Sequence, residues 1–195
     1  MYKSSKDLGR PSWDEYYLTL AYVVAQRSFD PSSKCGTVLV SKDNRILSTG
    51  YNGPIRGSID SKIPLTRPEK YKHMLHGEEN ALLAYSGSYQ DIQGATAFVT
   101  GRPCHKCLRM LLNKGIARIV YSSANVTQVV DKADMEAQEI MINEWEGNDN
   151  PTAQEDPSNL QPRVDMVEMG ADEVLGLLDK TKEYIEKKLT EEKNY

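Results

Sequence analysis

The chain has 195 residues, enough for one domain with a buried core, and 39% of them are hydrophobic while 27% are charged. This is a globular composition without any apolar run near the roughly 20 residues of a membrane-spanning helix, so no membrane partner is expected. The net charge of -4 is concentrated in residues 146–195, which carry 13 acids and 6 bases, and the mildly basic remainder suits a phosphorylated small substrate better than a nucleic acid.

The first part of the chain is typical of a helix followed by a β-hairpin. Residues 1–17 lack the apolar core of a signal peptide, which predicts a cytoplasmic protein. Ser12 is a candidate N-cap for a helix over residues 12–28, with acids in its first turn and apolar residues at helical spacing. The β-like segments 35–41 and 45–53, joined by the turn KDN, predict the hairpin.

The middle of the chain alternates helices and strands. Residues 53–72 contain three prolines and many charges, and we expect a loop there. A helix closed by Gly87 is predicted over residues 76–87, and a second helix, closed by Gly115, over residues 104–115. The remaining segments of this part are predicted strands, at 95–100 and 117–123. This succession is typical of a three-layer α/β architecture.

The last part of the chain combines helical, polar and amphipathic segments. We expect a helix over residues 131–146, a polar loop to residue 162 and an edge strand over residues 163–170. The final helix, over residues 171–193, carries one apolar face that should pack on the body or on another subunit, formed by Val174, Leu177, Leu178, Thr181, Ile185 and Leu189. We therefore predict a single domain over residues 1–195, with a catalytic body at about 12–145, a polar loop at about 146–162 and a C-terminal strand and helix at about 163–193.

One histidine and two cysteines have the spacing of a metal site. Cys104 and Cys107 lie three residues apart at the start of a predicted helix, so both side chains can face one point, and a helix N-terminus favours their thiolate forms. With His76 they would supply the three protein ligands of a catalytic zinc, which keeps a fourth position for water. A structural zinc or a redox dithiol is the alternative. A structural site needs a fourth ligand, for which His105 is poorly placed, whereas spacing alone does not exclude His73.

Two adjacent glutamates follow the histidine of this pattern. Glu78 completes the sequence H-x-E, which together with a later P-C-x-x-C is the signature of zinc deaminases, where the glutamate moves protons and binds no metal. Successive helical residues differ by about 100° around the axis, so Glu78 and Glu79 cannot both face the metal. We assign the proton transfer to Glu78 and expect Glu79 to be a solvated or helix-start residue.

From about Trp13 to Tyr121 the chain resembles the deoxycytidylate (dCMP) deaminases of the zinc-dependent cytidine/deoxycytidylate deaminase superfamily. The stretches AQRSFDPSSKCG, STGYNGPIRG and HGEENA carry this resemblance, in addition to the metal motifs. It implies a cytidine deaminase-like α/β/α fold with a central mixed five-stranded sheet. The chain departs from the family pattern at Gly77, Glu79 and Arg102, and again beyond Tyr121.

The resemblance also implies roles for residues around the metal. His76, Cys104 and Cys107 would hold zinc, and Glu78 would be the catalytic residue. The implied substrate-binding residues are Asn52 for the nucleotide sugar, with Arg27 and Ser28 for its phosphate. Many family members are hexamers regulated by dCTP and dTTP through a magnesium-dependent site, for which Asn52, Gly53 and Arg56 are the candidates here.

Simpler structural roles compete with several of these assignments. Arg27 could cap the C-terminus of its helix, and Ser28 could serve only the turn before Pro31. Asn52 could be a turn residue, and Arg56 a plain exposed charge. Cys35, Trp13 and Tyr16 are interpreted as core residues.

These observations predict hydrolysis of dCMP to dUMP and ammonia, which would supply dUMP for thymidylate synthesis. The expected partners are a nucleotide substrate, dCTP and dTTP as effectors, and further copies of the chain in a homo-oligomer, for which the resemblance implies a hexamer. The expected cofactors are one Zn²⁺ per chain and Mg²⁺ with the effector. The alternatives are a related deaminase acting on dCTP, 5-substituted dCMP, cytidine or tRNA adenosine, or a non-catalytic nucleotide-sensing protein.

Overall fold

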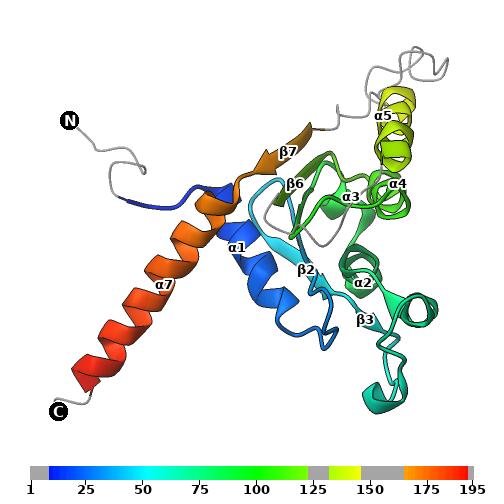
Figure 1. Cartoon of the computed structure of the whole chain (residues 1–195). Coiled ribbons are helices and arrows are strands. Elements are labelled where there is room, and N and C mark those ends of the chain that lie inside the picture. Colours follow the sequence, from blue (N-terminus) through cyan, green and yellow to red (C-terminus); the bar gives the residue numbers. More distant parts are fainter. Residues whose placement is uncertain (1–8, 123–131, 146–164, 193–195) are drawn as a thin grey trace, which may run out of the picture.

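A mixed five-stranded sheet forms the centre of the molecule (Figure 1). The computed structural model describes residues 9–122, 132–145 and 165–192. The sheet has the order β2-β1-β5-β6-β7. Its strands are β1 (Gly36–Val40), β2 (Ile46–Tyr51), β5 (Thr96–Val99), β6 (Arg118–Ser122) and β7 (Asp165–Met169). β1 is antiparallel to β2 and β5, whereas β5, β6 and β7 are parallel to one another, so the predicted hairpin and edge strand are confirmed.

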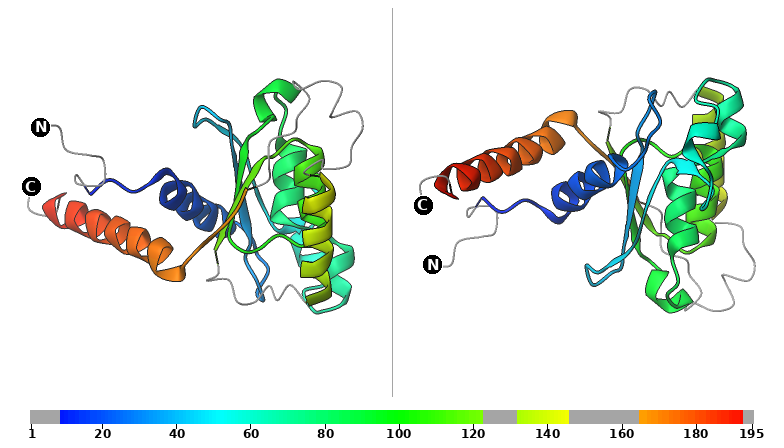
Figure 2. Two further views of the ribbon diagram at one scale, coloured as in Figure 1. Left: turned by 90° about the horizontal axis from the view of Figure 1, so that it is seen from above. Right: turned by 90° about the horizontal axis from the view of Figure 1, so that it is seen from below.

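Helices cover both faces of this sheet and complete the three predicted layers (Figure 2). α1 (Trp13–Ala25) and α7 (Ala171–Glu192) lie on one face, and α2 (Gly77–Ala84), α4 (His105–Asn113) and α5 (Lys132–Trp145) lie on the other. Each face has its own hydrophobic core. Because side chains alternate along a strand, Val38 and Val40 of β1 pack toward α1 while Leu39 packs toward α2 and α4.

α1 begins where the sequence predicts. Ser12 accepts a hydrogen bond from the Glu15 amide, and the Glu15 carboxylate accepts one from the Ser12 amide, which forms a capping box. The prediction that Trp13 and Tyr16 are core residues is wrong, because they are 58% and 41% exposed. Only Tyr17 of this aromatic group turns to the sheet, where it packs on Phe98.

The segment between β2 and α2 has more structure than the predicted loop. It contains two short antiparallel strands, β3 (Gly53–Pro54) and β4 (Met74–Leu75), and two 3-10 turns, η2 (Asp60–Lys62) and η3 (Glu69–Lys72). The sequence does not predict these elements, because each is too short to show a periodic pattern and the segment is rich in polar residues and prolines.

The helix ends match the predictions in one case of two. Gly115 follows α4 with a φ of +94°, as expected for a glycine in the C′ position. α2, however, ends at Ala84, and Tyr85 caps it in an extended conformation, so Gly87 does not close that helix. The short helix α3 (Tyr89–Ile92) follows Ser88, its N-cap, and was not predicted.

Among the α7 residues whose side chains the structure describes, those that pack on the body lie in the first turns. Val174 and Leu178 join the core beside α1, whereas Thr181 and Ile185 of the predicted apolar face are exposed. Figure 1 shows α7 running away from the sheet. The predicted polar loop at 146–162, the departure beyond Tyr121 at residues 123–131 and the side chain of Leu189 lie outside the described part of the chain. None of the described helices is both long and apolar enough to cross a bilayer.

Candidate metal centre and active site

The structure brings His76, Cys104 and Cys107 together. Their ligand atoms all lie within 4.8 Å of one another. His76 Nδ1 is 3.7 Å from Cys104 Sγ and 3.3 Å from Cys107 Sγ. His76 is the N-cap of α2 and Cys104 the N-cap of α4, so two helix N-termini converge on this point.

Close packing of α2 on the sheet sets the position of His76. Gly50 of β2 lies against α2, where a Cβ atom would collide with the backbone of Gly77 and Ala81. α2 can therefore approach β2 directly, and its N-terminus lies beside that of α4, which follows the central strand β5.

The geometry and protonation of this cluster fit a zinc ion. Tetrahedral bonds of about 2.3 Å to sulfur and about 2.0 Å to nitrogen place these ligand atoms about 3.5 Å apart, close to the separations observed. The hydrogen bond that the Cys104 sulfur accepts from Cys107, and after it the one that it shares with His76 as acceptor, lower the pKa of Cys104 to about 4, although burial opposes this shift. The hydrogen bond between Cys107 and Cys104, followed by burial, raises the pKa of Cys107. One ligand is therefore a thiolate at neutral pH even without the positive charge of a metal.

Glu78 is a buried carboxylate with an unsatisfied oxygen. Its side chain is 2% exposed in the first turn of α2, and Oε1 has no hydrogen-bond partner among the described residues. Burial raises the pKa of Glu78, while the charge of His76 opposes that shift. A buried polar atom without a partner is rare in a native protein and requires a water, an ion or a ligand to satisfy it. Glu78 Oε1 is thus available to form a hydrogen bond with a bound water or ligand.

Glu79 has a different environment from its neighbour. Its Oε2 accepts a hydrogen bond from the His76 amide at 2.8 Å, and its Oε1 pairs with Lys106 Nζ at 2.8 Å. Burial opposes ionisation, but these two partners outweigh it and lower the pKa of Glu79. The prediction of a helix-start residue is confirmed, whereas that of a solvated one is wrong, because only 8% of the residue is exposed.

Asn52 and Ser28, predicted to bind substrate, are held inside the protein. The side chain of Asn52 accepts a hydrogen bond from the Cys35 amide at 2.7 Å and donates one to the Ser33 carbonyl at 2.9 Å. Ser28 is 2% exposed, and its hydroxyl accepts a hydrogen bond from the Asp30 amide at 3.3 Å. Both side chains thereby shape the turn at residues 28–33.

Two arginines with predicted binding roles line one cavity. Arg27 and Arg56 both border a space of about 370 Å³, which is within the range of small-molecule sites. Tyr51, Asn80 and Asp60 add polar groups to its wall. The three zinc-ligand candidates do not line this cavity. Neither do Asn52 and Gly53, and Gly53 lies in β3.

A buried ion pair beside Asn52 has no counterpart in the sequence predictions. Lys70 and Asp30 are 2% and 3% exposed, and Lys70 Nζ lies 2.7 and 3.0 Å from the two carboxylate oxygens of Asp30. Lys70 also donates to Ser32. No local signal could have revealed this pair, because its members are 40 residues apart and Lys70 sits in a segment rich in exposed charges.

Arg102, which precedes Pro103, anchors the segment before Cys104. Its Nε donates to Gln138 Oε1 at 3.0 Å, and its guanidinium lies over the ring of Tyr121. Gln138, wholly buried in α5, donates to the Pro103 carbonyl at 2.8 Å. α5 thus supports the loop that carries the first cysteine.

Comparisons with known proteins agree with this geometry. The sequence model of the cytidine and deoxycytidylate deaminase zinc-binding region matches residues 11–123. The deoxycytidylate deaminases of Pongo abelii and Mus musculus are 32% and 33% identical to the chain over 117 residues, which cover 57% of this chain and 65% of those proteins. That of Mycobacterium phage D29 is 36% identical over 127 residues, which cover 58% of this chain and 97% of the phage protein.

A solved structure shares the fold. The dCMP deaminase of cyanophage S-TIM5 in its apo form superposes with a TM-score of 0.54, at 24% identity, over 82% of this chain and 99% of the phage protein. The same enzyme has been solved in complex with dCMP and dUMP, with a TM-score of 0.54 at 23% identity and coverage of 82% and 98%. At these identities the likeness establishes the fold, which confirms the predicted mixed five-stranded α/β architecture.

Proposed function

The chain belongs to the cytidine and deoxycytidylate deaminase family, and we propose that it is a zinc-dependent hydrolase that converts dCMP to dUMP and ammonia. The observation that carries this proposal is the buried Glu78 carboxylate, whose Oε1 has no partner among the described residues, in the first turn of the helix that begins at His76, beside the cluster of His76, Cys104 and Cys107. The chain matches only 65% of the length of its mammalian relatives, whose names nevertheless support dCMP as the substrate, as does the dCMP and dUMP complex of the phage enzyme.

The chain's own residues would carry out the proton transfers of this reaction. His76, Cys104 and Cys107 would hold zinc, which when bound supplies a water of lowered pKa for attack on C4 of the cytosine. Glu78 would accept one proton from that water and deliver it to N3, and it would then move the second proton of the same oxygen to the departing amine. The C4–O bond forms, the C4–N bond breaks, and ammonia leaves with the transferred proton. Burial raises the pKa of the Glu78 carboxyl, which is the direction in which enzymes tune a glutamate that both accepts and returns a proton.

Arg27 supports a phosphorylated substrate. It borders the same cavity as Arg56, and these two cations outnumber the one carboxylate of the wall, that of Asp60, so the space can hold an anionic group. We retain Arg27, Ser28 and Asn52 as the substrate-binding residues, with Ser28 and Asn52 acting at least through the turn that they hold. Regulation by dCTP and dTTP through Gly53 and Arg56, with Mg²⁺ accompanying the nucleotide, also stays a prediction.

The wider role of the chain follows from the same proposal. The product dUMP would supply thymidylate synthesis, with the enzyme in the cytoplasm and assembled as a homo-oligomer of one-domain subunits. The exposed half of α7 supports assembly, because Tyr184 and Ile185 leave apolar surface uncovered among the described residues.

Ammonia release across a substrate panel tests the proposed reaction. Cytidine, dCMP, dCTP and 5-substituted dCMP would be compared with the zinc-loaded protein, with and without dCTP and dTTP as effectors. We expect dCMP to have the highest kcat/KM. A higher value for another compound would identify a related deaminase, and nucleotide binding without any ammonia would identify a nucleotide-sensing protein.

A further inference from the structure

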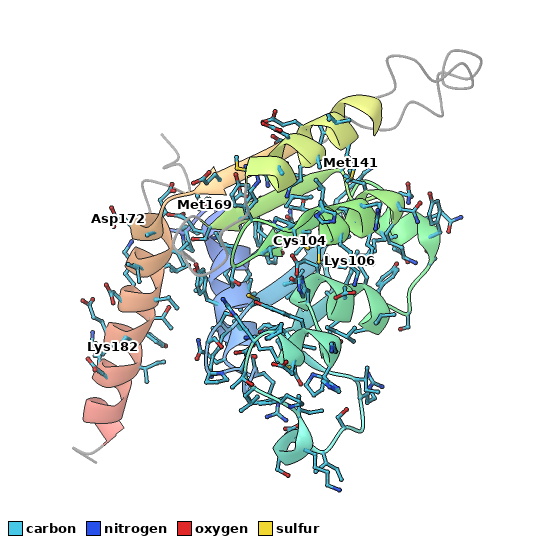
Figure 3. All side chains as sticks on the ribbon, turned by 45° about the vertical axis from the view of Figure 1, so that its right-hand side comes forward. Cys104, Lys106, Met141, Met169, Asp172 and Lys182 are labelled. Carbon is cyan, nitrogen blue, oxygen red and sulfur yellow. The ribbon has the colours of Figure 1, made fainter. Side chains whose placement is uncertain are left out.

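A bridge of two side chains joins the helices that carry the candidate zinc ligands. Glu79 belongs to α2, three residues after His76. Lys106 belongs to α4, between Cys104 and Cys107, and Figure 3 labels it together with Cys104. We propose that Glu79 and Lys106 are positioning residues that hold His76 in register with the two cysteines and so determine how tightly the site retains zinc. This inference rests on the zinc site proposed above.

The carboxylate of Glu79 uses its two oxygens for two different elements. Oε2 accepts from the backbone amide of His76, so it fixes the residue that provides the only nitrogen of the cluster. Oε1 accepts from the ammonium group of Lys106, which lies on the neighbouring helix. One rigid planar group therefore links the backbone of one ligand residue to the helical turn that holds the other two.

Ordinary helix capping accounts for only half of this arrangement. A glutamate at the third helical position commonly bonds the N-cap amide, and that bond needs no lysine on another helix. The contact with Lys106 connects α2 to α4. His76 lies at the start of α2 and both cysteines at the start of α4, so a movement of one helix relative to the other would separate the ligands.

Partners outside the ligand set are known to control metal sites. Groups that orient the ligands of a metal typically change its affinity by about 10- to 100-fold when they are removed. The Lys106 side chain is 55% exposed and that of Glu79 is 10% exposed, so removal of the lysine leaves the helix cap in place and costs less stability than the loss of a fully buried partner. Loss of Lys106 should therefore affect zinc retention more than the unfolding temperature.

Zinc release from the full-length holoprotein into an excess of a chromogenic chelator measures this effect. Glu79→Leu removes both links and should release zinc about 10- to 100-fold faster than the wild type. Glu79→Gln keeps an oxygen for the His76 amide, and Lys106→Met keeps the cap intact, so each should give a smaller acceleration. In the Glu79→Leu background, Lys106→Met should have no further effect, because the lysine then has nothing to hold.

Arg109→Met provides the matched control. Arg109 is another exposed base of α4, two residues after Cys107, and its removal changes the charge of the helix without touching the bridge. We expect wild-type zinc release from this variant. A cobalt-substituted protein adds a spectroscopic signature, because the thiolate-to-cobalt absorption bands should shift in Glu79→Leu and not in Arg109→Met.

The outcomes separate this inference from the proposed function. Wild-type release rates in both Glu79→Leu and Lys106→Met would overturn the bridge and leave the deaminase proposal intact. Equal acceleration by Lys106→Met and Arg109→Met would reduce the effect to general charge and would also overturn it. If Glu79→Leu does not fold, the exposed Lys106→Met still decides the matter. A wild-type protein that binds no zinc would overturn both proposals.

Discussion

Two regions of this molecule bury a carboxylate, and they treat it in opposite ways. Asp30 is 3% exposed, and its two oxygens are bonded by Lys70 and by the amides of Ser32 and Ser33. Glu78 is equally buried, yet one of its oxygens has no partner among the described residues. Burial of a charge is costly unless hydrogen bonds or an opposite charge compensate it.

The pKa values of the two carboxyl groups are shifted in opposite directions. Hydrogen bonds outweigh burial at Asp30 and lower its pKa, so that carboxylate stays ionised and tethers the 53–75 segment to the turn at residues 28–33. Burial dominates at Glu78 and raises its pKa. A carboxyl group that is isolated in this way is poised to exchange protons, whereas a saturated one is a structural tie. Substitutions in the two regions should therefore have opposite signatures.

The largest effect is expected at Glu78. Glu78→Ala should lower the rate of ammonia release by at least about 10²- to 10⁴-fold, because it removes the group that transfers the proton. Zinc content, measured by elemental analysis, should stay near one ion per chain, since Glu78 is not among the ligands. Activity that survives this substitution would show that the proton passes through another group.

Lys70→Met should lower the stability of the fold rather than remove a group that takes part in the reaction. It leaves the Asp30 carboxylate buried without its counter-ion, and the loss of one partner of a buried pair costs about 3–5 kcal/mol of unfolding free energy, measurable by urea denaturation. The exposed pair of Arg45 and Asp43 offers the control, so Arg45→Met should change stability little. If Lys70→Met and Arg45→Met lowered the unfolding free energy equally, the buried ion pair would contribute no more to stability than the exposed one.

Acid should weaken the same tie. The folded-state pKa of Asp30 lies below the unfolded value of 3.8, so its contribution is complete above about pH 4 and is lost as the pH falls through the folded-state pKa. One such group gives a slope of at most about 1.4 kcal/mol per pH unit. Urea unfolding at a series of pH values should show a shallower acid dependence for Asp30→Asn, which cannot titrate. Identical slopes for the variant and the wild type would assign the acid dependence to other groups.

The smallest effect on stability is expected on α7. Tyr184 and Ile185 are 63% and 50% exposed, so replacing both by serine should change the unfolding free energy by less than about 0.5 kcal/mol. The subunit count by light scattering is the informative readout, because a contact with a second copy would use this surface. A double variant with unchanged mass and unchanged stability would place any subunit interface elsewhere.

The sequence alone predicted the features that depend on neighbouring residues. Ser12 and Glu15 form the expected cap, Gly115 ends α4, and the two turn-linked strands pair as a hairpin. Each of these depends on hydrogen bonds or backbone angles within a few residues, which spacing and residue type determine. The H-x-E and C-x-x-C motifs could be located for the same reason.

The tertiary structure decided how those local features meet. That Trp13 is exposed while Tyr17 is buried depends on where the sheet lies beneath α1. The pairing of Lys70 with Asp30, and of Lys106 with Glu79, joins residues 40 and 27 positions apart. Such contacts follow from how helices pack on the sheet, and no local pattern encodes them, because the charges involved look like solvated surface residues until the fold brings their partners within hydrogen-bonding distance.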